Sequence, residues 1–575
     1  MSAVARRLPE IFVAAVFLAL LATDAVLASG VRDVPHWDLW NWIPWLTGRQ
    51  PVDAAWIWSQ HSEHRMPAAR LVHLAIARLA HGDLRIATWI MLASIAGSVA
   101  ALVLALRRAR GRTDYLDAVV PVALMHPGHA EGFLWTFDLT MAMAAATFAA
   151  VLAVVVVSRD GLTRTGAAVA GAGVVTMPLW GSQGLIAAPA LAIWLAVAGW
   201  RSSPGARAIA WTGSATALAV AAAWVVGIEV PFLYPGERTT YAVARCASEV
   251  LATAIGTAGA HGWPVSAALV GVVATGGLVA GVRKLRLPDE RLRAFGLATA
   301  FVAVVATVAI TGFGRANFPR GTGLGMRYVV TTAPLLVIAY LLASPPRAGA
   351  FGRCVAFAAF TLACAALSTN VEAGSQWASQ RRREADAFVR DALADVPIGE
   401  LSRRHAGTLF SGNVPQFTEF ARALREADMG PFRLSSEERV RRIGRLAWDA
   451  RTDLPMFPRP PAAIRSAANP RRVAVGGVVA IEIDPPAELR YGVLPGRYHV
   501  TGRYDGPAPL HAALRDPGRG GERAVAVETA SAEPGALVPF AFDLDAPSAA
   551  LLVLRPESNP ERKPARFTGI DLQRS

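Results

Sequence analysis

The stretch that decides the architecture runs from Gly30 to Arg70 and reads GVRDVPHWDLWNWIPWLTGRQPVDAAWIWSQHSEHRMPAAR. It follows an apolar segment at residues 10–28 and holds six tryptophans and three histidines. Tryptophan is enriched where apolar and aqueous surroundings meet, as they do at a membrane surface. Ionisable side chains are costly to place there and commonly serve a function. The stretch therefore predicts a loop on the membrane surface that carries part of a functional site.

The composition of the whole chain is that of a membrane protein. Of its 575 residues, 53% are hydrophobic and only 17% are charged, whereas soluble domains carry nearer a quarter charged residues. The net charge of +14 does not indicate nucleic-acid binding, because much of the excess arginine lies in connectors between apolar segments, where the positive-inside rule places it. The three cysteines show no metal-binding spacing.

Eleven apolar segments account for most of the first 369 residues. The connectors after the second, fourth, sixth, eighth and tenth segments are short and basic, which places them in the cytoplasm. The sequence therefore predicts a mainly α-helical, polytopic membrane bundle of about eleven spans, with the amino terminus inside and the carboxyl terminus outside. We expect the first segment to remain as an anchor, and its removal as a signal peptide is the alternative. The predicted spans are 10–28, 84–106, 116–130, 137–157, 165–180, 184–200, 208–228, 265–282, 294–312, 327–343 and 353–369.

Three regions follow from this pattern. Residues 1–369 form the membrane domain, whose outer loop at 29–83 contains an amphipathic segment, 66–80, that predicts a helix lying in the interface. Residues 370–470 are expected outside the membrane, as a charged amphipathic helix and a proline-rich linker. Residues 471–575 alternate apolar and polar positions in short runs, which predicts an antiparallel β-sandwich. A carbohydrate-binding role and a structural role for this last domain remain open.

Three short motifs stand at corresponding places in this plan. An acidic residue, Asp38 in HWDLW, follows the first span; Arg85 in HGDLRIATW leads into the second; and Arg327 with Tyr328 in GMRYVVTTAPLL opens a late span. Together with the order of spans, loop and carboxyl-terminal domain, they resemble the GT-C class of membrane glycosyltransferases over nearly the whole chain. The acidic site departs from that class, because a single Asp stands where a doubled acidic pair is usual. The identity of the base therefore stays open.

The resemblance implies a function on the outer side of the bacterial cytoplasmic membrane. It implies a transferase that moves a sugar from a polyprenyl-phosphate carrier to a hydroxyl of a cell-envelope glycan or lipid, with inversion. The implied partners are the lipid-linked donor, the glycan or lipid acceptor and membrane lipid, without nucleic acid. Two alternatives remain: a transporter or flippase of lipid-linked glycan, and a noncatalytic protein of envelope polysaccharide assembly.

Such a transfer needs a carboxylate that accepts a hydroxyl proton and cations that stabilise the departing lipid phosphate. Asp38 is the first choice for the base, since burial among tryptophans would raise the pKa of a carboxyl and strengthen it as a base. Arginines are expected at the phosphate because guanidinium binds its oxygens in pairs. The predicted catalytic residues are Asp38, Glu63 and Glu131, the predicted phosphate- and donor-binding residues are Arg65, Arg327, Tyr328, Arg320 and Arg85, and the predicted acceptor- and sugar-stacking residues are Trp37, Trp40 and His64.

The run HSEHR, residues 61–65, has the residue types of a metal site. His61 and Glu63 from this run, with His129 from a second predicted outer loop, are the candidates for a divalent cation. The spacing matches no strong zinc signature, so no cofactor is assigned. In the alternative interpretation Glu63 pairs with Arg65 or orients hydroxyls of the acceptor.

Overall fold

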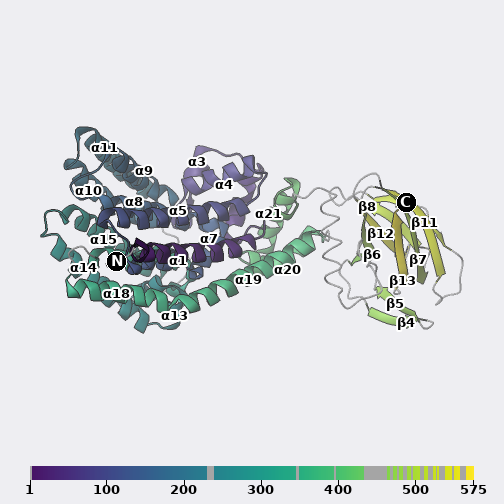
Figure 1. Cartoon of the computed structure of the whole chain (residues 1–575). Coiled ribbons are helices and arrows are strands. Elements are labelled where there is room, and N and C mark those ends of the chain that lie inside the picture. Colours follow the sequence, from purple (N-terminus) through teal and green to yellow (C-terminus); the bar gives the residue numbers. More distant parts are fainter. Residues whose placement is uncertain are drawn as a thin grey trace. The chain divides into compact units, whose positions relative to one another are not determined.

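The computed structural model describes residues 3–229, 238–344, 349–393 and 396–432 and, in the carboxyl-terminal region, residues 463–465, 471–475, 478–483, 489–493, 496–505, 510–515, 522–525, 527–529, 538–546, 550–556 and 565–574. The chain divides into two compact units, Met1–Arg383 and Glu384–Ser575. The first is a bundle of helices and the second ends in a small β region (Figure 1). The prediction of a mainly helical chain with β structure at its carboxyl end is therefore confirmed.

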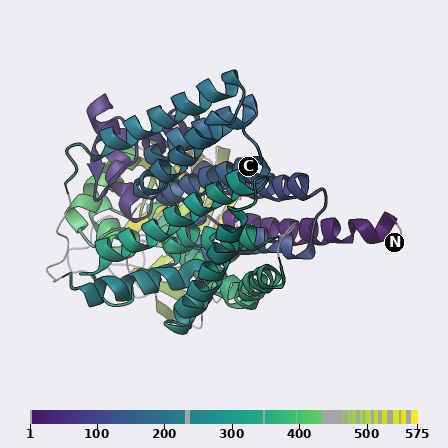
Figure 2. The ribbon, with the colours of Figure 1, turned by 90° about the vertical axis from the view of Figure 1, so that its left-hand side faces the viewer.

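Nine helical segments in the described ranges are long and apolar enough to cross a membrane. Each overlaps one predicted span, and together they make the chain a multi-pass membrane protein by length and composition. The first, helix α1, extends past its neighbours in the view of Figure 2. The nine segments are Arg7–Ser29, Arg85–Arg110, Thr136–Val157, Ser182–Trp200, Pro204–Val225, Val265–Lys284, Arg291–Arg315, Met326–Ala343 and Ala350–Leu393.

Two of the eleven predicted spans are shorter in the structure than the nine long segments. Span 116–130 is broken into short helices, since Pro127 supplies no N–H and interrupts the helical hydrogen bonds. Span 165–180 is helix α9, with 17 residues. Both segments still pass between the ends of the bundle, as the contacts of the next paragraph show.

The two ends of the bundle carry different parts of the chain. At one end, the Trp135 indole N–H donates to the His36 carbonyl (2.9 Å) and Ser182 Oγ bonds His64 Nδ1 (2.7 Å), which brings the tryptophan-rich loop together with the starts of α8 and α10. At the other end, the Leu162 N–H donates to Ser202 Oγ (2.7 Å), which joins two basic connectors. We call these the loop end and the connector end. The tryptophan-rich loop and these two basic connectors thus lie at different ends of the bundle, as the alternation of basic connectors along the sequence predicts.

The helices of the first unit begin and end as follows. They are α1 (Ala3–Ser29), α5 (Arg85–Arg110), η2 (Tyr115–Ala118), α6 (Val119–Met125), η3 (Pro127–His129), α7 (Ala130–Leu134), η4 (Thr136–Asp138), α8 (Leu139–Val157), α9 (Arg164–Trp180), α10 (Ser182–Trp200), α11 (Pro204–Val225), α12 (Thr240–Ala252), η5 (Thr253–Ile255), α13 (Thr257–His261), α14 (Val265–Lys284), α15 (Arg291–Arg315), η6 (Thr322–Leu324), η7 (Met326–Tyr328), α16 (Val329–Thr332), α17 (Pro334–Ala343) and α18 (Ala350–Ala365). Helix α19 (Leu367–Leu393) continues into the second unit.

The loop between α1 and α5 folds into short helices and one hairpin. These are η1 (Trp37–Trp42), α2 (Ile43–Leu46), α3 (Ala54–Trp58), β1 (Gln60–His61), β2 (His64–Arg65) and α4 (Pro67–Leu79), so the helix predicted at 66–80 is present. Arg70 is buried beneath them, donates to the Ser59 carbonyl and Oγ (2.8 Å each) and lies over the rings of Trp42 and Trp56. The Leu84 N–H donates to Asp33 Oδ1 (2.9 Å), which ties the two ends of the loop together.

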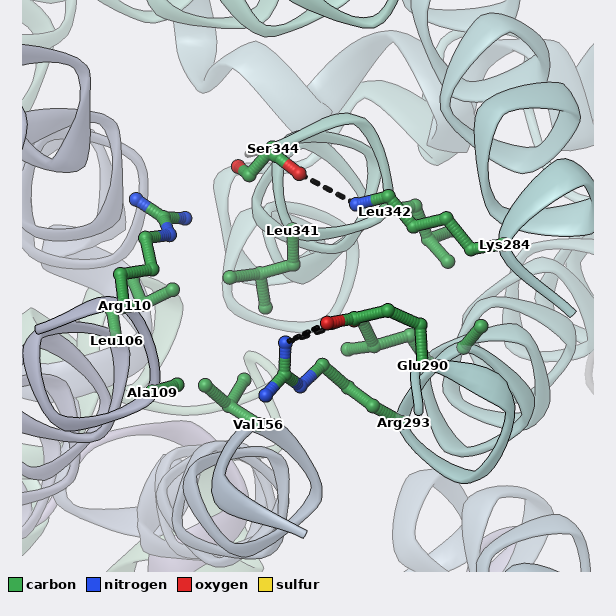
Figure 3. A pocket seen from close by; sticks show the side chains of 12 residues that line it. Leu106, Ala109, Arg110, Val156, Lys284, Glu290, Arg293, Leu341, Leu342 and Ser344 are labelled. Carbon is green, nitrogen blue, oxygen red and sulfur yellow. Dashed lines mark hydrogen bonds and ion pairs between the residues drawn. The ribbon is translucent and has the colours of Figure 1, made fainter. Parts of the chain in front are cut away.

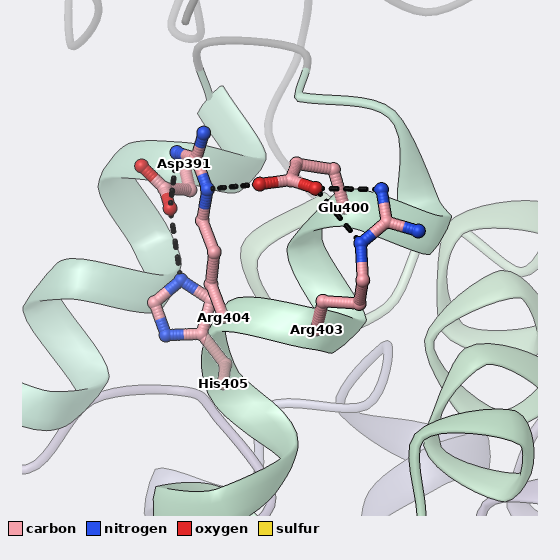
Figure 4. Close-up of polar contacts among 5 residues, drawn as sticks. All are labelled: Asp391, Glu400, Arg403, Arg404 and His405. Carbon is pink, nitrogen blue, oxygen red and sulfur yellow. Dashed lines mark hydrogen bonds and ion pairs between the residues drawn. The ribbon is translucent and has the colours of Figure 1, made fainter.

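The helices of the second unit are held by charged pairs. Helix α20 (Ile398–Leu409) follows α19, and α21 (Val414–Glu426) and η8 (Gly430–Phe432) come next. Asp391 of α19 accepts hydrogen bonds from His405 (2.9 Å) and Arg404 (3.2 Å), and Glu400 accepts from Arg403 and Arg404 (Figure 4). Phe388 and Phe417 pack edge to face beside them. These contacts are those of an ordinary helix–helix interface.

The β region contains two antiparallel sheets. Six strands pair in the order β10-β11-β7-β13-β5-β4 and five in the order β3-β6-β12-β8-β9. Alternate residues of β7 and β11, such as Val500 and Leu544, are buried, as the alternating sequence predicts. The strands are β3 (Ala463–Arg465), β4 (Arg471–Val475), β5 (Val478–Ile483), β6 (Leu489–Val493), β7 (Gly496–Asp505), β8 (Leu510–Arg515), β9 (Glu522–Val525), β10 (Glu528–Thr529), β11 (Val538–Ala546), β12 (Ala550–Pro556) and β13 (Ala565–Arg574).

Candidate active site at the loop end

The hairpin β1–β2 places Glu63 and His64 beside the helices of the bundle. Its tight turn is completed by Ser62, whose backbone has a positive φ of 49°. Glu63 forms an ion pair with Arg315, the last residue of α15. His64 lies between two partners, with Nε2 3.5 Å from Glu63 Oε1 and Nδ1 2.7 Å from Ser182 Oγ. The predicted pairing of Glu63 with Arg65 is therefore wrong, because Arg315 takes that place.

Glu131 and Arg327 come together although they lie far apart in the sequence. The backbone N–H of Arg327 donates to Glu131 Oε2 (3.0 Å), and the Glu131 N–H in turn donates to the sulfur of Met326 (3.4 Å). The Arg327 guanidinium lies over the ring of Tyr328, 5.4 Å from its centroid. It also interacts electrostatically with Glu131 and Glu63. Tyr328 itself is buried against Val250 and Val308, which makes it an anchor for Arg327.

Asp138 is a site residue that we did not predict. It stands at the start of α8, is only 2% exposed, and interacts electrostatically with Glu131, Arg327 and Asp38. Its Oδ2 has no hydrogen-bond partner among the described residues. A carboxyl in the first turn of an apolar span is expensive unless it has a role, and this rule applied to TFDLT would have found it.

Asp38 lies on η1 and is the accessible member of the set of acidic side chains that also includes Glu131 and Asp138. Its side chain is 45% exposed, so the predicted burial among tryptophans is wrong, and its Oδ1 is 3.9 Å from His61 Nε2. Trp37 beside it is exposed and has a positive φ of 47°, an uncommon conformation for a bulky residue. Trp40 is completely buried. The prediction that Trp40 stacks on a sugar is therefore wrong, because its ring fills the core of the loop, whereas Trp37 is accessible.

The pKa values of the two glutamates in the site are shifted in opposite directions. Burial raises the pKa of Glu131 above its ordinary value, against the opposing charges of Arg327 and Arg381. Burial would also raise the pKa of Glu63, but the adjacent His64 and Arg315 outweigh it and hold that pKa below its ordinary value. Burial lowers the pKa of His64 to about 4. At neutral pH the site therefore contains an ionised Glu63 and a neutral His64.

Three of the predicted phosphate-binding arginines are engaged elsewhere or lie apart. Arg65 is buried and donates to the carbonyls of Val226 (2.9 Å) and Gly227 (3.1 Å), so it braces a neighbouring loop. Arg85 pairs with Asp83 at 2.6 Å, and Arg320 is exposed.

Two other arginines take their place at the loop end. Arg315 pairs with Glu63, as described above. Arg381 of α19 donates to His36 Nε2 and interacts electrostatically with Glu131. Burial and the charge of Arg381 lower the pKa of His36 to about 3, so this imidazole is a neutral acceptor. Both arginines come from distant parts of the chain, and no local motif marks them.

The candidates for a metal ion do not come together. His129 is buried, with Nε2 2.9 Å from the Ala123 carbonyl, and its ring lies beside that of His126. His61 lies near Asp38 and the ring of Phe137. In the described part of the chain no group of three His, Cys, Asp or Glu side chains is arranged to hold a metal ion. These three candidate residues are therefore not arranged to hold a divalent cation together.

An apolar pocket of about 40 Å³ lies between the helices next to this site. Met141 lies one turn beyond Asp138, Val330 one turn beyond Arg327, and Gln183 follows Ser182, so part of the pocket wall lies close to the loop end. A second apolar pocket shares Phe148 and Pro334 with it. Charged side chains of the loop end thus lie next to an apolar pocket within the bundle.

Comparison with known proteins adds no assignment. No protein-family model matches the chain, and a search of curated proteins finds no match. The function therefore has to be argued from the chemistry of the site.

Proposed function

We propose that this protein is a membrane glycosyltransferase that moves a sugar from a polyprenyl-phosphate carrier to a hydroxyl of a cell-envelope glycan or lipid, with inversion. The observation that carries the proposal is one gathering of charged side chains at the loop end, beside the apolar pocket between the helices. The gathering consists of the carboxylates Asp38, Glu63, Glu131 and Asp138 and the arginines Arg315, Arg327 and Arg381. A lipid-linked sugar presents the complementary combination of an apolar chain, a phosphate and a polar ring.

Asp38 is the proposed general base. Glu63 is tied to Arg315, and Glu131 holds the backbone of Arg327, so both carboxylates already have partners. Asp38 is the most accessible of the four, and its described contact is the one with His61. As the acceptor oxygen bonds to the anomeric carbon, the Asp38 carboxylate takes the hydroxyl proton and the bond from that carbon to the carrier phosphate breaks. Trp37 is placed to stack on a sugar ring beside it.

The arginines of the loop end are proposed to stabilise the leaving phosphate. Arg327 is held by Glu131 and by the ring of Tyr328, so its fork is oriented before the substrate arrives. Positioned cations that meet the charge developing on the leaving group lower the barrier without reorganisation. The apolar side chains of Met141, Met177 and Val330, which line the pocket, would contact the carrier chain. In this proposal the loop end faces the outside, because the basic connectors lie at the other end.

Replacing Asp38 by Asn tests the proposal. The substitution keeps the size of the side chain and removes the basic oxygen, so sugar transfer should fall at least about a hundredfold. The assay incubates purified full-length protein with a panel of polyprenyl-phosphate sugars and measures released polyprenyl phosphate.

Asp53→Asn is the matched control from the same loop. Asp53 caps α3 by accepting the Trp56 N–H (2.7 Å), and Asn caps a helix equally well, so this variant should retain transfer. Folding of both variants is checked by size-exclusion chromatography. Full activity of Asp38→Asn would refute the assignment of the base. Translocation of lipid-linked glycan by wild-type protein without sugar transfer would replace the proposed enzyme with a flippase.

A further inference from the structure

The connector end contains a second cluster of buried charges that the proposed transfer does not use. Three cations, Arg110 of α5, Lys284 of α14 and Arg293 of α15, are each more than nine-tenths buried. Two carboxylates, Asp117 and Glu290, are buried with them. The five residues come from two stretches of the chain, 110–117 and 284–293, which the tertiary structure brings together.

Two of the three cations have carboxylate partners. Arg110 donates to Asp117 Oδ1 (2.7 Å), which also accepts from the Tyr340 hydroxyl (2.5 Å). Arg293 donates through one nitrogen to both oxygens of Glu290 (3.1 and 2.9 Å). Lys284 Nζ instead donates to the backbone carbonyl of Ser344 (2.5 Å), which carries no charge. The cluster therefore has one positive charge in excess.

Among the described residues, several donors of this cluster have no acceptor. Within the described residues, one terminal nitrogen of Arg110 and both Nε and a terminal nitrogen of Arg293 are buried without a hydrogen-bond partner. A buried donor without an acceptor is destabilising, and more so when it belongs to a charged group. A buried charge without a counter-ion is costlier still. The unpaired donors and the excess charge both indicate a missing anion.

These side chains surround a cavity of about 20 Å³ (Figure 3). Arg110, Lys284, Glu290, Arg293 and Ser344 supply its polar wall, and leucine, valine and alanine side chains supply the rest. In Figure 3 the Arg110 guanidinium stands across the opening from Lys284, with Arg293 between them along one side. The volume exceeds the space that one water molecule needs, so a small polar group can enter.

We propose that the connector-end cavity binds the oxygens of a phosphate group, with Lys284 as counter-charge and Arg110 and Arg293 as hydrogen-bond donors. Guanidinium groups match the geometry of phosphate oxygens, and a lysine serves as a point charge for them. Basic pockets between membrane helices are known binding places for anionic lipid headgroups. The same chemistry accepts inorganic phosphate from solution, so the experiment has an arm for each source. The inference does not depend on the proposed sugar transfer, because it concerns the opposite end of the bundle.

The first arm measures binding of inorganic phosphate. Thermal unfolding of purified full-length protein in detergent is followed while sodium phosphate is added, against sodium chloride of equal ionic strength. Phosphate should raise the unfolding temperature of the wild type, and Lys284→Met should bind it at least tenfold more weakly. Without phosphate, Lys284→Met should be at least as stable as the wild type, because it removes an uncompensated buried charge. Arg286→Gln removes an exposed charge from the same connector and should bind phosphate like the wild type.

The second arm tests lipid headgroups. The wild type and both variants are reconstituted in nanodiscs of phosphatidylcholine, with or without added phosphatidylglycerol. Stabilisation by phosphatidylglycerol that Lys284→Met loses and Arg286→Gln keeps identifies a lipid as the source, whereas the same pattern in the first arm alone identifies free phosphate.

Three results would overturn the inference. They are no stabilisation in either arm, equal stabilisation of wild type and Lys284→Met, and equal loss in Arg286→Gln. Phosphorus analysis of delipidated wild-type protein at saturating phosphate is a further measurement that needs no variant. A content well below one phosphate for each chain would also overturn it.

Discussion

The imidazole of His73 makes the stability of the loop end depend on pH. His73 lies on α4, is fully buried, and contacts the Ala69 carbonyl through Nδ1 (2.9 Å) and the ring of Trp42 edge to face. Burial lowers its pKa from 6.5 to about 4. The folded protein therefore holds this side chain neutral under conditions in which the unfolded chain would bind a proton.

The sign and size of the effect follow from this difference. As the pH falls below 6.5, His73 binds a proton in the unfolded chain, whereas in the folded protein it does so only near pH 4. Acid therefore favours unfolding. The stabilisation is complete above the unfolded pKa and is lost as the pH falls towards the folded one. Between about pH 7.5 and about pH 4.5 this single group should cost about 2.5 kcal/mol of unfolding free energy.

His73→Gln isolates the contribution, because other buried histidines titrate in both proteins. Unfolding free energy is measured by denaturation in mixed micelles at both pH values, and the variant should lose about 2.5 kcal/mol less than the wild type on acidification. His81→Asn, which changes an exposed imidazole on the same loop, is the control. Asn tolerates the positive φ of 50° at that position. Equal acid losses in wild type and His73→Gln would refute the reasoning.

Two further predictions concern packing within the bundle. Asp117→Ala should lower the unfolding free energy by about 3–5 kcal/mol, because it leaves Arg110 buried without its carboxylate; Tyr340→Phe, which removes only a hydroxyl, should cost about 2 kcal/mol. The same denaturation assay compares the loss of unfolding free energy in the two variants, and a larger loss in Tyr340→Phe would contradict the prediction. Gly184→Ala should destabilise the bundle by about 3 kcal/mol or more, since its Cβ would stand 1.9 Å from the Met177 carbonyl oxygen. Gly97→Ala, whose Cβ meets no atom within 4 Å, is the matched control, and similar yields of folded protein on size-exclusion chromatography would contradict this prediction.

Local sequence patterns were sufficient for the membrane helices and for the character of the carboxyl-terminal region. Apolar runs predicted segments that overlap the nine long helices, and period-two alternation predicted β structure in the carboxyl-terminal region, because these signals depend on neighbours along the chain. The same reasoning did not predict that two of the eleven spans are short. Hydropathy alone does not register that Pro127 breaks a helix or that α9 has only 17 residues.

The composition of the two charged clusters was decided by the tertiary structure. The predicted site residues Asp38, Glu63, His64, Glu131 and Arg327 lie at one end of the bundle. Yet Glu63 pairs with Arg315, 252 positions away, rather than with nearby Arg65. Asp117 accepts a hydrogen bond from Tyr340, 223 positions away. Periodicity tells which face of a helix is apolar, but a buried charge takes its partner from whichever segment the packing brings beside it. That choice depends on contacts between distant segments, which no local pattern records.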